Sequence, residues 1–571
     1  MVASTTTSAA ELRWDAPGPG PWEAEGAHYP RPLARFGRAN VTKSFAAGFA
    51  ESTARYGLLL SHFEIGIVNG FWYQQPAAFG APKGAKGPPP PPVLWLLTRL
   101  HPKIRARIRE TELAFAERRW REDLARWDEK DKPHALTEHR RLLAVAPAEL
   151  DDGALLDHLA DCERHLGAMV HLHHRYTITA CFPTGDFLVH VSDWTGKPAG
   201  EVLAVLRGST PMSNGFSTTE LEALASALKS DDEARAVVES AASPTEVVER
   251  LRAAPGATGE AARAFFDLVW HRAVNYDIGD KSTGEMPEVI VSAIRAAVKG
   301  LGKATTDDSK ARIVALREQV PSEHRAQFDA LLEEARTINR LRDERGLFAD
   351  CWAVGIARRG VLEAGRRLVT RSKILQADHA VDLELDELRA LFGDATTPTA
   401  DEVRDRVEWR RTKTVADVPA HLGGAPAGPP DPGLLPAIAR RAARAVDAVL
   451  SNLFNDTTRT STDEVVRGIS VNEGVYEGTA RLVHDASEFG RLQQGDVLVT
   501  RSTAPYFNVV LPMLGALVTD RGGQLCHAAI VAREYGIPGV VGTKEATTRI
   551  PDGARVRVDG ATGEVTILSR G

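Results

Sequence analysis

The chain has 571 residues, more than one hydrophobic core ordinarily serves, so we expect several domains. Its formal net charge of −6 gives no electrostatic support for nucleic-acid binding, and its four well-separated cysteines, with no CxxC pair, argue against a disulfide framework or a zinc site. The N-terminal residues are polar and lack the apolar segment of a signal peptide, and no run of about 18 apolar residues predicts a membrane span. We therefore expect a cytoplasmic protein.

Proline and glycine are frequent near the beginning of the chain. Residues 1–45 predict an irregular segment, and the run at 83–92, which ends in five prolines, predicts a stiff extended insert. From there to about residue 415 apolar residues recur at helical spacing, and one such face is formed by Leu155, Leu159, Cys162, Leu166, Met169 and Val170. The sequence therefore predicts a mostly α-helical domain over 46–433, with long charged helices such as 104–130.

A second proline- and glycine-rich stretch, 423–433, ends the helical region. One more helix is expected over 434–453, and the polar run 455–463 is typical of a hinge. We therefore interpret 434–463 as a linker between two domains.

After the linker the periodicity changes to that of short strands, most of them bounded by Gly, Asp or Pro. Two helices are expected among them, at about 504–514 and at 527–535. The strands are expected at 466–475, 478–483, 496–500, 516–519, 539–541, 555–559 and 565–568. Residues 464–571 thus predict a compact α/β domain, and the chain as a whole is multidomain.

The strongest chemical signal is a histidine, His527, which follows an apolar strand and a Gly522-Gly523 turn and opens a helix. Backbone N–H groups and the helix dipole favour an anion there, and an imidazole can carry a phosphoryl group covalently. We expect the phosphoryl group to be bound by the two glycines, Arg521 and Cys526, with Arg533 as a second possible cation. The alternative is a structural histidine at a strand–helix junction.

Longer motifs favour the chemical interpretation. They are Asp496-Val-Leu-Val-Thr-Arg-Ser-Thr503, Gly515-Ala-Leu-Val-Thr-Asp-Arg-Gly-Gly523, Cys526-His-Ala-Ala-Ile-Val-Ala-Arg533 and Gly536-Ile-Pro-Gly-Val-Val-Gly542. This region resembles the phosphohistidine swivelling domain of the phosphoenolpyruvate-utilising (dikinase) enzyme family. Weaker similarity upstream is to the middle part of rifampin phosphotransferase. One departure is Leu525, where these enzymes often carry a hydroxyl residue.

The resemblance implies that ATP phosphorylates His527 on an ATP-grasp domain, with Mg²⁺, and leaves AMP and phosphate. No ATP-grasp pattern precedes residue 465, and no pyruvate-binding barrel follows the last predicted strand. We therefore expect a heteromeric enzyme in which a separate ATP-grasp subunit binds ATP and Mg²⁺. The chain is similar to the histidine-bearing subunit of phenylphosphate synthase and of alkylphenol-phosphorylating enzymes, which implies a phenolic acceptor. The alternatives are a phosphoryl-carrier or regulatory module with a protein partner, and an antibiotic-inactivating phosphotransferase.

The acceptor site is expected in the helical region, where a base must reach the acceptor hydroxyl. His173 lies on the predicted inward face and is the candidate base, with His174 beside it; the alternative is a satisfied core histidine. Two sets of residues complete the predicted site: a phosphoryl clamp of Arg340, Arg342 and Arg345, and an apolar wall that includes Trp72 and Phe63. The arginines have an alternative role in an intrahelical ion-pair network. The sequence contains no cluster of carboxylates that we would assign to a metal ion, so no metal site is predicted.

Overall fold

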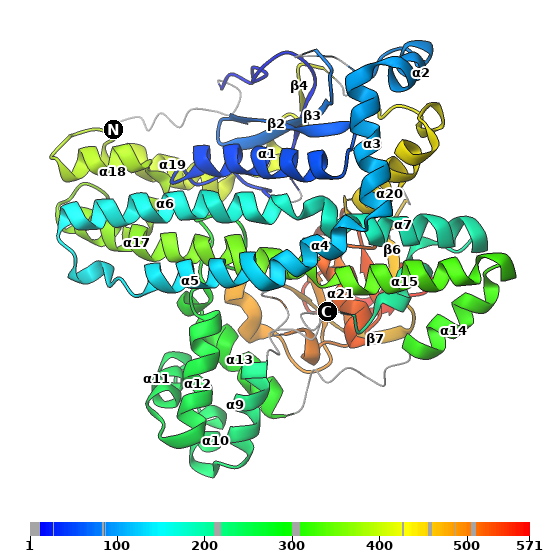
Figure 1. Cartoon of the computed structure of the whole chain (residues 1–571). Helices are drawn as coiled ribbons and strands as arrows, with labels where there is room; N and C mark the ends of the chain where they lie inside the picture. The colour runs from blue at the N-terminus through cyan, green and yellow to red at the C-terminus, as the bar shows by residue number, and fades with distance from the viewer. Residues whose placement is uncertain are drawn as a thin grey trace. The chain divides into compact units, whose positions relative to one another are not determined.

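A computed structural model describes residues 12–570 except 27, 83, 84, 86, 210–218, 300–308, 425–427, 455–459, 485, 504–506, 508 and 509. The chain, whose helices and strands are labelled in Figure 1, divides into two compact units. The first unit contains Met1–Ile178, Tyr276–Asp280 and Phe348–Ala443; the second contains Thr179–Asn275, Lys281–Leu347 and Arg444–Gly571. The predicted helical region therefore contributes to both units, and the predicted domain boundaries stay predictions.

A small antiparallel sheet lies in the first unit, with three strands in the region predicted to be mostly helical and one in the segment 1–45 that was predicted to be irregular. Its strand order is β2 (Leu60–Val68), β3 (Phe71–Ala78), β1 (Trp22–Ala24) and β4 (His421–Leu422). Asn69 and Gly70, with φ of 50° and 88°, join β2 to β3. Asn-Gly favours this two-residue hairpin turn because both positions need positive φ.

Long helices cover this sheet. Helix α1 (Arg38–Arg55) packs on β2 and on α6 (Asp152–Arg175), and α17 (Cys351–Thr370) packs on α6. The predicted apolar face of α6 is confirmed, because all six of its residues are buried. Gly48 of α1 lies so close to α6 that an added Cβ would be 2.3 Å from the His171 carbonyl oxygen. The two helix backbones therefore approach closely just before the turn that carries His173.

The remaining helices of the first unit are shorter. They are α2 (Pro91–Leu100), α3 (Pro102–Ala116), α4 (Arg119–Arg126), α5 (Lys132–Leu143), α18 (Leu385–Phe392) and α19 (Ala400–Thr412). The predicted long helix 104–130 is interrupted, since Arg118 adopts φ 51°. The last two prolines of the predicted extended insert begin α2 instead, and residues 83, 84 and 86 of that insert are outside the described residues.

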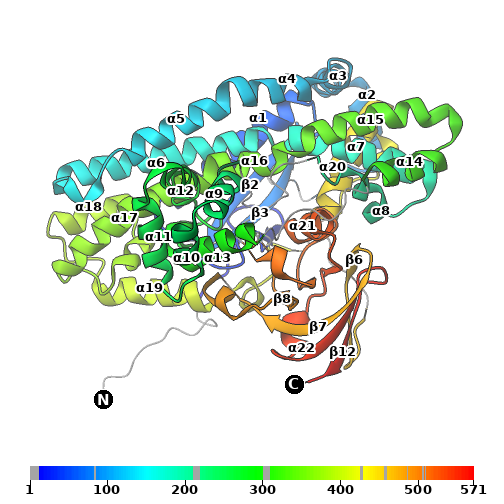
Figure 2. The ribbon, with the colours of Figure 1, turned by 90° about the horizontal axis from the view of Figure 1, so that it is seen from below.

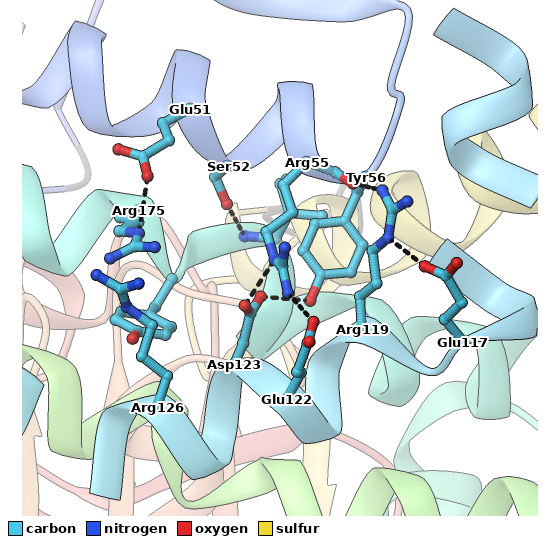
Figure 3. A network of polar contacts seen from close by, with 12 residues as sticks. Glu51, Ser52, Arg55, Tyr56, Glu117, Arg119, Glu122, Asp123, Arg126 and Arg175 are labelled. Atoms are coloured by element: carbon cyan, nitrogen blue, oxygen red, sulfur yellow. Dashed lines mark hydrogen bonds and ion pairs between the residues drawn. The ribbon is translucent and has the colours of Figure 1, made fainter. Parts of the chain in front are cut away.

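Ion pairs fix the ends of α1, α4 and α6 (Figure 3). Arg55 pairs with Asp123 and with Glu122, each at 2.6 Å, and Tyr56 donates a hydrogen bond to Asp123 at 2.8 Å. On α6, Arg175 pairs with Glu51 of α1 at 2.8 Å. Because both partners of this last pair lie at helix ends, the C-terminal turn of α6 is held against α1.

The second unit is built around an eight-stranded sheet in the order β5-β12-β11-β7-β8-β9-β10-β6. Strands β7, β8, β9 and β10 are parallel, while β6, β11, β12 and β5 pair antiparallel. Their bounds are β5 Val465–Arg467, β6 Ile469–Asn472, β7 Val475–Leu482, β8 Val497–Thr500, β9 Ala516–Thr519, β10 Gly539–Val541, β11 Arg555–Asp559 and β12 Glu564–Ser569. The predicted strands are confirmed, except that 466–475 divides into β5, β6 and the start of β7.

Alternate residues of the central strands pack on two different helices, both visible in Figure 2. Leu498 and Leu517 share an apolar cluster with α21 (His527–Tyr535), whose predicted bounds are confirmed. Val497 and Val518 share another cluster with α22 (Ala546–Arg549). This alternation is what a strand buried on both faces requires.

Other helices complete the second unit. They are α7 (Thr177–Thr195), α8 (Ala199–Leu203), α9 (Thr219–Lys229), α10 (Asp232–Glu239), α11 (Pro244–Ala253), α12 (Gly256–Val269), α13 (Pro287–Val298), α14 (Ser309–Gln319), α15 (Arg325–Asn339), α16 (Leu341–Arg345) and α20 (Ala437–Phe454), of which α7 and α20 begin in the first unit. The predicted helix 504–514 is wrong for its described residues, where Leu511–Met513 forms a 3₁₀ turn. Most of the predicted hinge, 455–459, is outside the described residues. Among the helices the structure describes, none has the length and apolarity needed to cross a membrane.

The contact between α1 and α6 generates a stability prediction. We expect Gly48→Ala to lower the free energy of unfolding by about 1–3 kcal/mol, because the new methyl group meets backbone that cannot rotate away. Gly153→Ala on α6 is the matched control, since its Cβ would meet nothing nearer than Asp151 Oδ1 at 3.5 Å. Urea unfolding compares the two, and equal midpoints would contradict the prediction.

Candidate functional site

His527 lies beyond the carboxyl ends of adjacent parallel strands. Thr500, the last residue of β8, pairs with Thr519, the last residue of β9. The chain leaving β9 turns at Gly522 and begins α21 at His527. Ligand sites of parallel sheets form at this edge, and the first turn of α21 directs backbone N–H groups toward it.

The loop before His527 is shaped by its glycines. Gly522 has φ 109°, and a Cβ at this position would lie 2.6 Å from Cys526 Sγ. Gly523 donates its N–H to the Leu453 carbonyl at 3.2 Å, and Leu525 donates to Asn452 at 2.7 Å. The loop is therefore tied to the end of α20, and the Gly523 N–H is already used. Phosphoryl binding by these glycines stays a prediction.

The two ring nitrogens of His527 have different surroundings. Nδ1 lies 2.8 Å from Thr503 Oγ1, whereas Nε2 is buried and has no hydrogen-bond partner among the described residues. A proton on Nε2 would thus be an unpaired buried donor, so the favoured tautomer carries its proton on Nδ1 and its lone pair on Nε2. Thr503 was not among the predicted site residues, although it is the last residue of the Asp496–Thr503 motif and lies just after β8.

Electrostatics keeps the His527 ring neutral. Burial, and then the positive charge of Arg342 on α16, lower the pKa of His527 to about 3. The structure thus brings one predicted clamp arginine to bear on the predicted phosphoryl carrier, although 185 positions separate them in the sequence. A neutral imidazole with its lone pair on Nε2 is a competent nucleophile.

The other predicted arginines have different surroundings. Arg340 donates to both carboxylate oxygens of Glu344, at 2.9 and 3.0 Å, which is the intrahelical ion pair foreseen as its alternative role. The positive charges of Arg345 and Arg342 both act on the buried thiol of Cys181. For Arg521 the main-chain N–H donates to the Arg501 carbonyl at 2.9 Å, and its role toward a phosphoryl group stays a prediction.

Arg533 supports the loop. Its guanidinium donates to the side-chain oxygen of Gln524 at 3.0 Å and also to the Gln524 carbonyl. Burial lowers the pKa of Arg533 to about 10. Arg533 therefore holds the turn that presents His527, which is a different role from the phosphoryl contact expected of it.

The two residues before His527 are both apolar in character. Burial raises the pKa of the Cys526 thiol, so it stays protonated at neutral pH. Leu525 is 2% exposed and packs in an apolar cluster with helical residues such as Val205 and Leu332. The leucine that departs from the family pattern is thus an anchor between the loop and the helices of the second unit.

The predicted acceptor residues gather in the first unit. His173 Nδ1 lies 2.7 Å from Asp350 Oδ2, and the ring of His174 stacks on that of His173. Phe45 contacts both His174 and Trp72. Phe63 joins this group of rings through Phe49, at 5.1 Å between centroids. Asp350 and Phe45 were not predicted, because their sequence positions carry no periodic signal that links them to His173.

Two segments match known domain families. Residues 492–563 match the mobile domain of PEP-utilising enzymes, and residues 178–343 match the fourth domain of rifampicin phosphotransferase. Parts of the chain are therefore similar to domains of phosphoenolpyruvate-utilising and rifampicin-phosphorylating enzymes. The first segment contains His527 and the second contains Arg340 and Arg342, so both halves of the site fall within family domains.

Individual members of the family show the same similarity. The chain is 30% identical over 247 residues to an uncharacterised phosphotransferase, YvkC, of Bacillus subtilis. It is 45% identical over 107 residues to rifampicin phosphotransferase of Streptomyces sviceus, and 44% over 100 residues to phosphoenolpyruvate synthase of Escherichia coli. These matches cover 43%, 19% and 18% of this chain, and 28%, 12% and 13% of the relatives. They span less than a third of the length of each relative.

The effect of the Arg342 charge on the pKa of His527 generates a prediction. We expect Arg342→Gln to raise the pKa of His527, because a positive charge that opposes protonation is removed. Nitrogen chemical shifts of the imidazole, followed by NMR from pH 7 to pH 3, measure this. Arg340→Gln is the matched control, since Arg340 is paired with Glu344. An unchanged His527 pKa in Arg342→Gln would contradict the assignment.

The lowered pKa of His527 also makes the stability of the folded chain depend on pH. The folded value of about 3 lies below the ordinary value of 6.5, so the unfolded chain binds the proton more readily. The contribution of His527 to stability is therefore complete above about pH 6.5 and is lost as the pH falls toward 3.

Proposed function

We propose that the chain is the phosphoryl-carrying subunit of an ATP-dependent, dikinase-type phosphotransferase. The observation that carries this proposal is the state of His527, whose Nδ1 is held by Thr503 and whose buried Nε2 bears the lone pair. The relatives named phosphotransferase and phosphoenolpyruvate synthase support phosphoryl transfer as the reaction class.

The proposed reaction has two transfers. In the first, Nε2 of His527 attacks the β-phosphorus of ATP, and an N–P bond forms as the bond from that phosphorus to the AMP oxygen breaks. Water then cleaves the bond between the β- and γ-phosphoryl groups, so AMP and phosphate are released. In the second, an acceptor hydroxyl attacks the same phosphorus, the N–P bond breaks, and the neutral imidazole is restored. Overall, ATP, water and the acceptor become the phosphorylated acceptor, AMP and phosphate. We assign the binding of ATP and Mg²⁺ to a separate ATP-grasp subunit.

The acceptor we propose is a phenol. Support comes from the group of aromatic rings around His173 and His174, which suits a planar ligand. A phenolic O–H, with a pKa of about 10, also needs less help from a base than an alkyl alcohol does. His527 must visit a donor and then an acceptor, and we propose that movement about 455–463 carries it.

A labelling experiment tests the carrier. We expect the chain to incorporate acid-labile phosphate from ATP labelled at the β-phosphorus when the ATP-grasp subunit is added, and His527→Ala to abolish it. His484→Ala, an exposed histidine of the same α/β domain, is the matched control and should retain the label. Label that survives His527→Ala would contradict the assignment of His527 as the carrier. Label acquired without the second subunit would contradict the proposal that a separate subunit binds ATP.

The fate of the label tests the acceptor. Transfer to phenol, with AMP as the nucleotide product, is the expected outcome. Label that moves instead to a protein would identify a carrier module, and label that moves only to a bulky macrocycle would identify an antibiotic-inactivating enzyme. Either result would replace the phenol in this proposal.

The role of Thr503 generates a separate prediction. We expect Thr503→Val to slow loading of His527 by about 10–100-fold, because residues that orient a ring nitrogen commonly contribute that much. Thr503→Ser keeps the hydroxyl and should retain most of the rate. Initial rates of phosphohistidine formation distinguish the two, and equal rates in Thr503→Val and the unaltered chain would contradict the assigned role.

A further inference from the structure

We propose that His173 is the base that takes the proton from the acceptor hydroxyl, with Asp350 as the residue that positions it. This inference rests on the proposed function and locates its acceptor chemistry in the first unit. It concerns a pair of side chains that come from α6 and from the residue just before α17.

The geometry of the pair fits this role. His173 and Asp350 are both buried, with 7% and 4% of their surface exposed. Asp350 accepts from His173 Nδ1 through Oδ2, at 2.7 Å, and from the Cys351 main-chain N–H through Oδ1, at 3.1 Å. A carboxylate that accepts from Nδ1–H leaves the lone pair of the neutral ring on Nε2 and stabilises the imidazolium formed when Nε2 gains a proton.

A second buried histidine on α6 has a different environment. His165, also 7% exposed, contacts the ring of His139 at 2.8 Å, and His139 contacts the Phe348 carbonyl at 3.0 Å. Burial lowers the pKa of His165 to about 4. His165 therefore shows how this helix holds a structural histidine, whereas His173 is paired with a carboxylate.

Aromatic rings form a surface next to the pair. Tyr276 lies edge-on to His173, at 5.8 Å between centroids, and Phe45 lies 3.9 Å from the ring of His174. Trp72 contacts Phe45 at 5.2 Å, and Tyr29 stacks on Trp72 at 4.9 Å. Tyr29, Phe45, His174 and Tyr276 are all partly exposed, so a planar aromatic acceptor has ring faces on which to stack.

The same residues raise the alternative of a metal site, since His173, His174 and Asp350 place ligand atoms within 4.8 Å of one another. The two imidazole rings, however, are stacked 4.5 Å apart with 18° between their planes. A metal ion binds an imidazole nitrogen in the plane of the ring, and one ion cannot lie in two nearly parallel planes. The observed ring geometry therefore favours a proton acceptor.

Phosphoryl transfer to the acceptor exchanges an N–P bond for an O–P bond and moves one proton. The acceptor oxygen forms a bond to phosphorus as the N–P bond to His527 breaks, and both electrons of that bond return to His527 Nε2. The acceptor proton moves to His173 Nε2, and the resulting imidazolium releases it to water after the phosphorylated product leaves. No oxidant or further reactant is needed.

The experiment uses the full chain with phosphohistidine already formed on His527, and measures single-turnover transfer to phenol and to the more acidic 4-nitrophenol. We expect His173→Gln to slow transfer to phenol by about 100-fold, as loss of a general base does, and to slow transfer to nitrophenol much less. Asp350→Asn should show the same dependence on acceptor acidity. His165→Gln is the matched control and should leave both transfer rates unchanged.

Loading of His527 separates failure of this inference from failure of the proposed function. If the unaltered chain fails to form phosphohistidine or to transfer to any phenol, the proposed function fails. If loading is normal but His173→Gln slows both acceptors equally, the base assignment is overturned. Zinc bound in a one-to-one ratio, lost in His173→Gln and required for transfer, would also overturn it. Because Asp350→Asn preserves the side-chain shape, it keeps the test decisive if His173→Gln does not fold.

Discussion

The hydrogen bond between Thr503 and His527, at 2.8 Å, is the interaction on which the proposed carrier chemistry depends. It requires β8 and β9 to be adjacent and parallel, because only then do the segments that follow them meet at one edge of the sheet. It also decides which ring nitrogen is nucleophilic. The sheet, with helices packed on both faces, holds this edge rigid, and the tie between Gly523 and Leu453 fixes the loop beside it.

The positive charge near His527 disfavours a proton on its ring and favours an anion bound to it. Burial removes the water that would stabilise an imidazolium, and the charge of Arg342 opposes it directly. A phosphoryl group on Nε2 is negative, so that charge and the N-terminus of α21 both stabilise it. In the proposed reaction, the site would thus distinguish the free His527, which is neutral, from the phosphorylated His527, which is anionic.

Local signals in the sequence predict the second unit's sheet and α21 well, because alternation and a helix start are encoded within a few residues. The predictions from local signals are wrong where a proline opposes the expected helix, or where a turn signal in the sequence was not used. Pro512 disfavours the helix expected at 504–514, and Asn69-Gly70 specifies the unpredicted hairpin. The partner of His173 lies 177 residues away, and no spacing rule connects Asp350 to it. Long-range pairs of this kind are set by packing, which sequence periodicity does not reveal.

The burial of Leu525 has an energetic consequence for movement of His527. For His527 to leave its observed surroundings, this side chain must first be withdrawn from its apolar cluster and exposed to water. Exposing a leucine costs about 1.5–3 kcal/mol, which corresponds to roughly a tenfold to hundredfold smaller population of the released loop. A hydroxyl residue at this position would impose little of that penalty. In the proposed reaction, a donor or acceptor that captures the loop would therefore have to supply this free energy through its own binding to the loop.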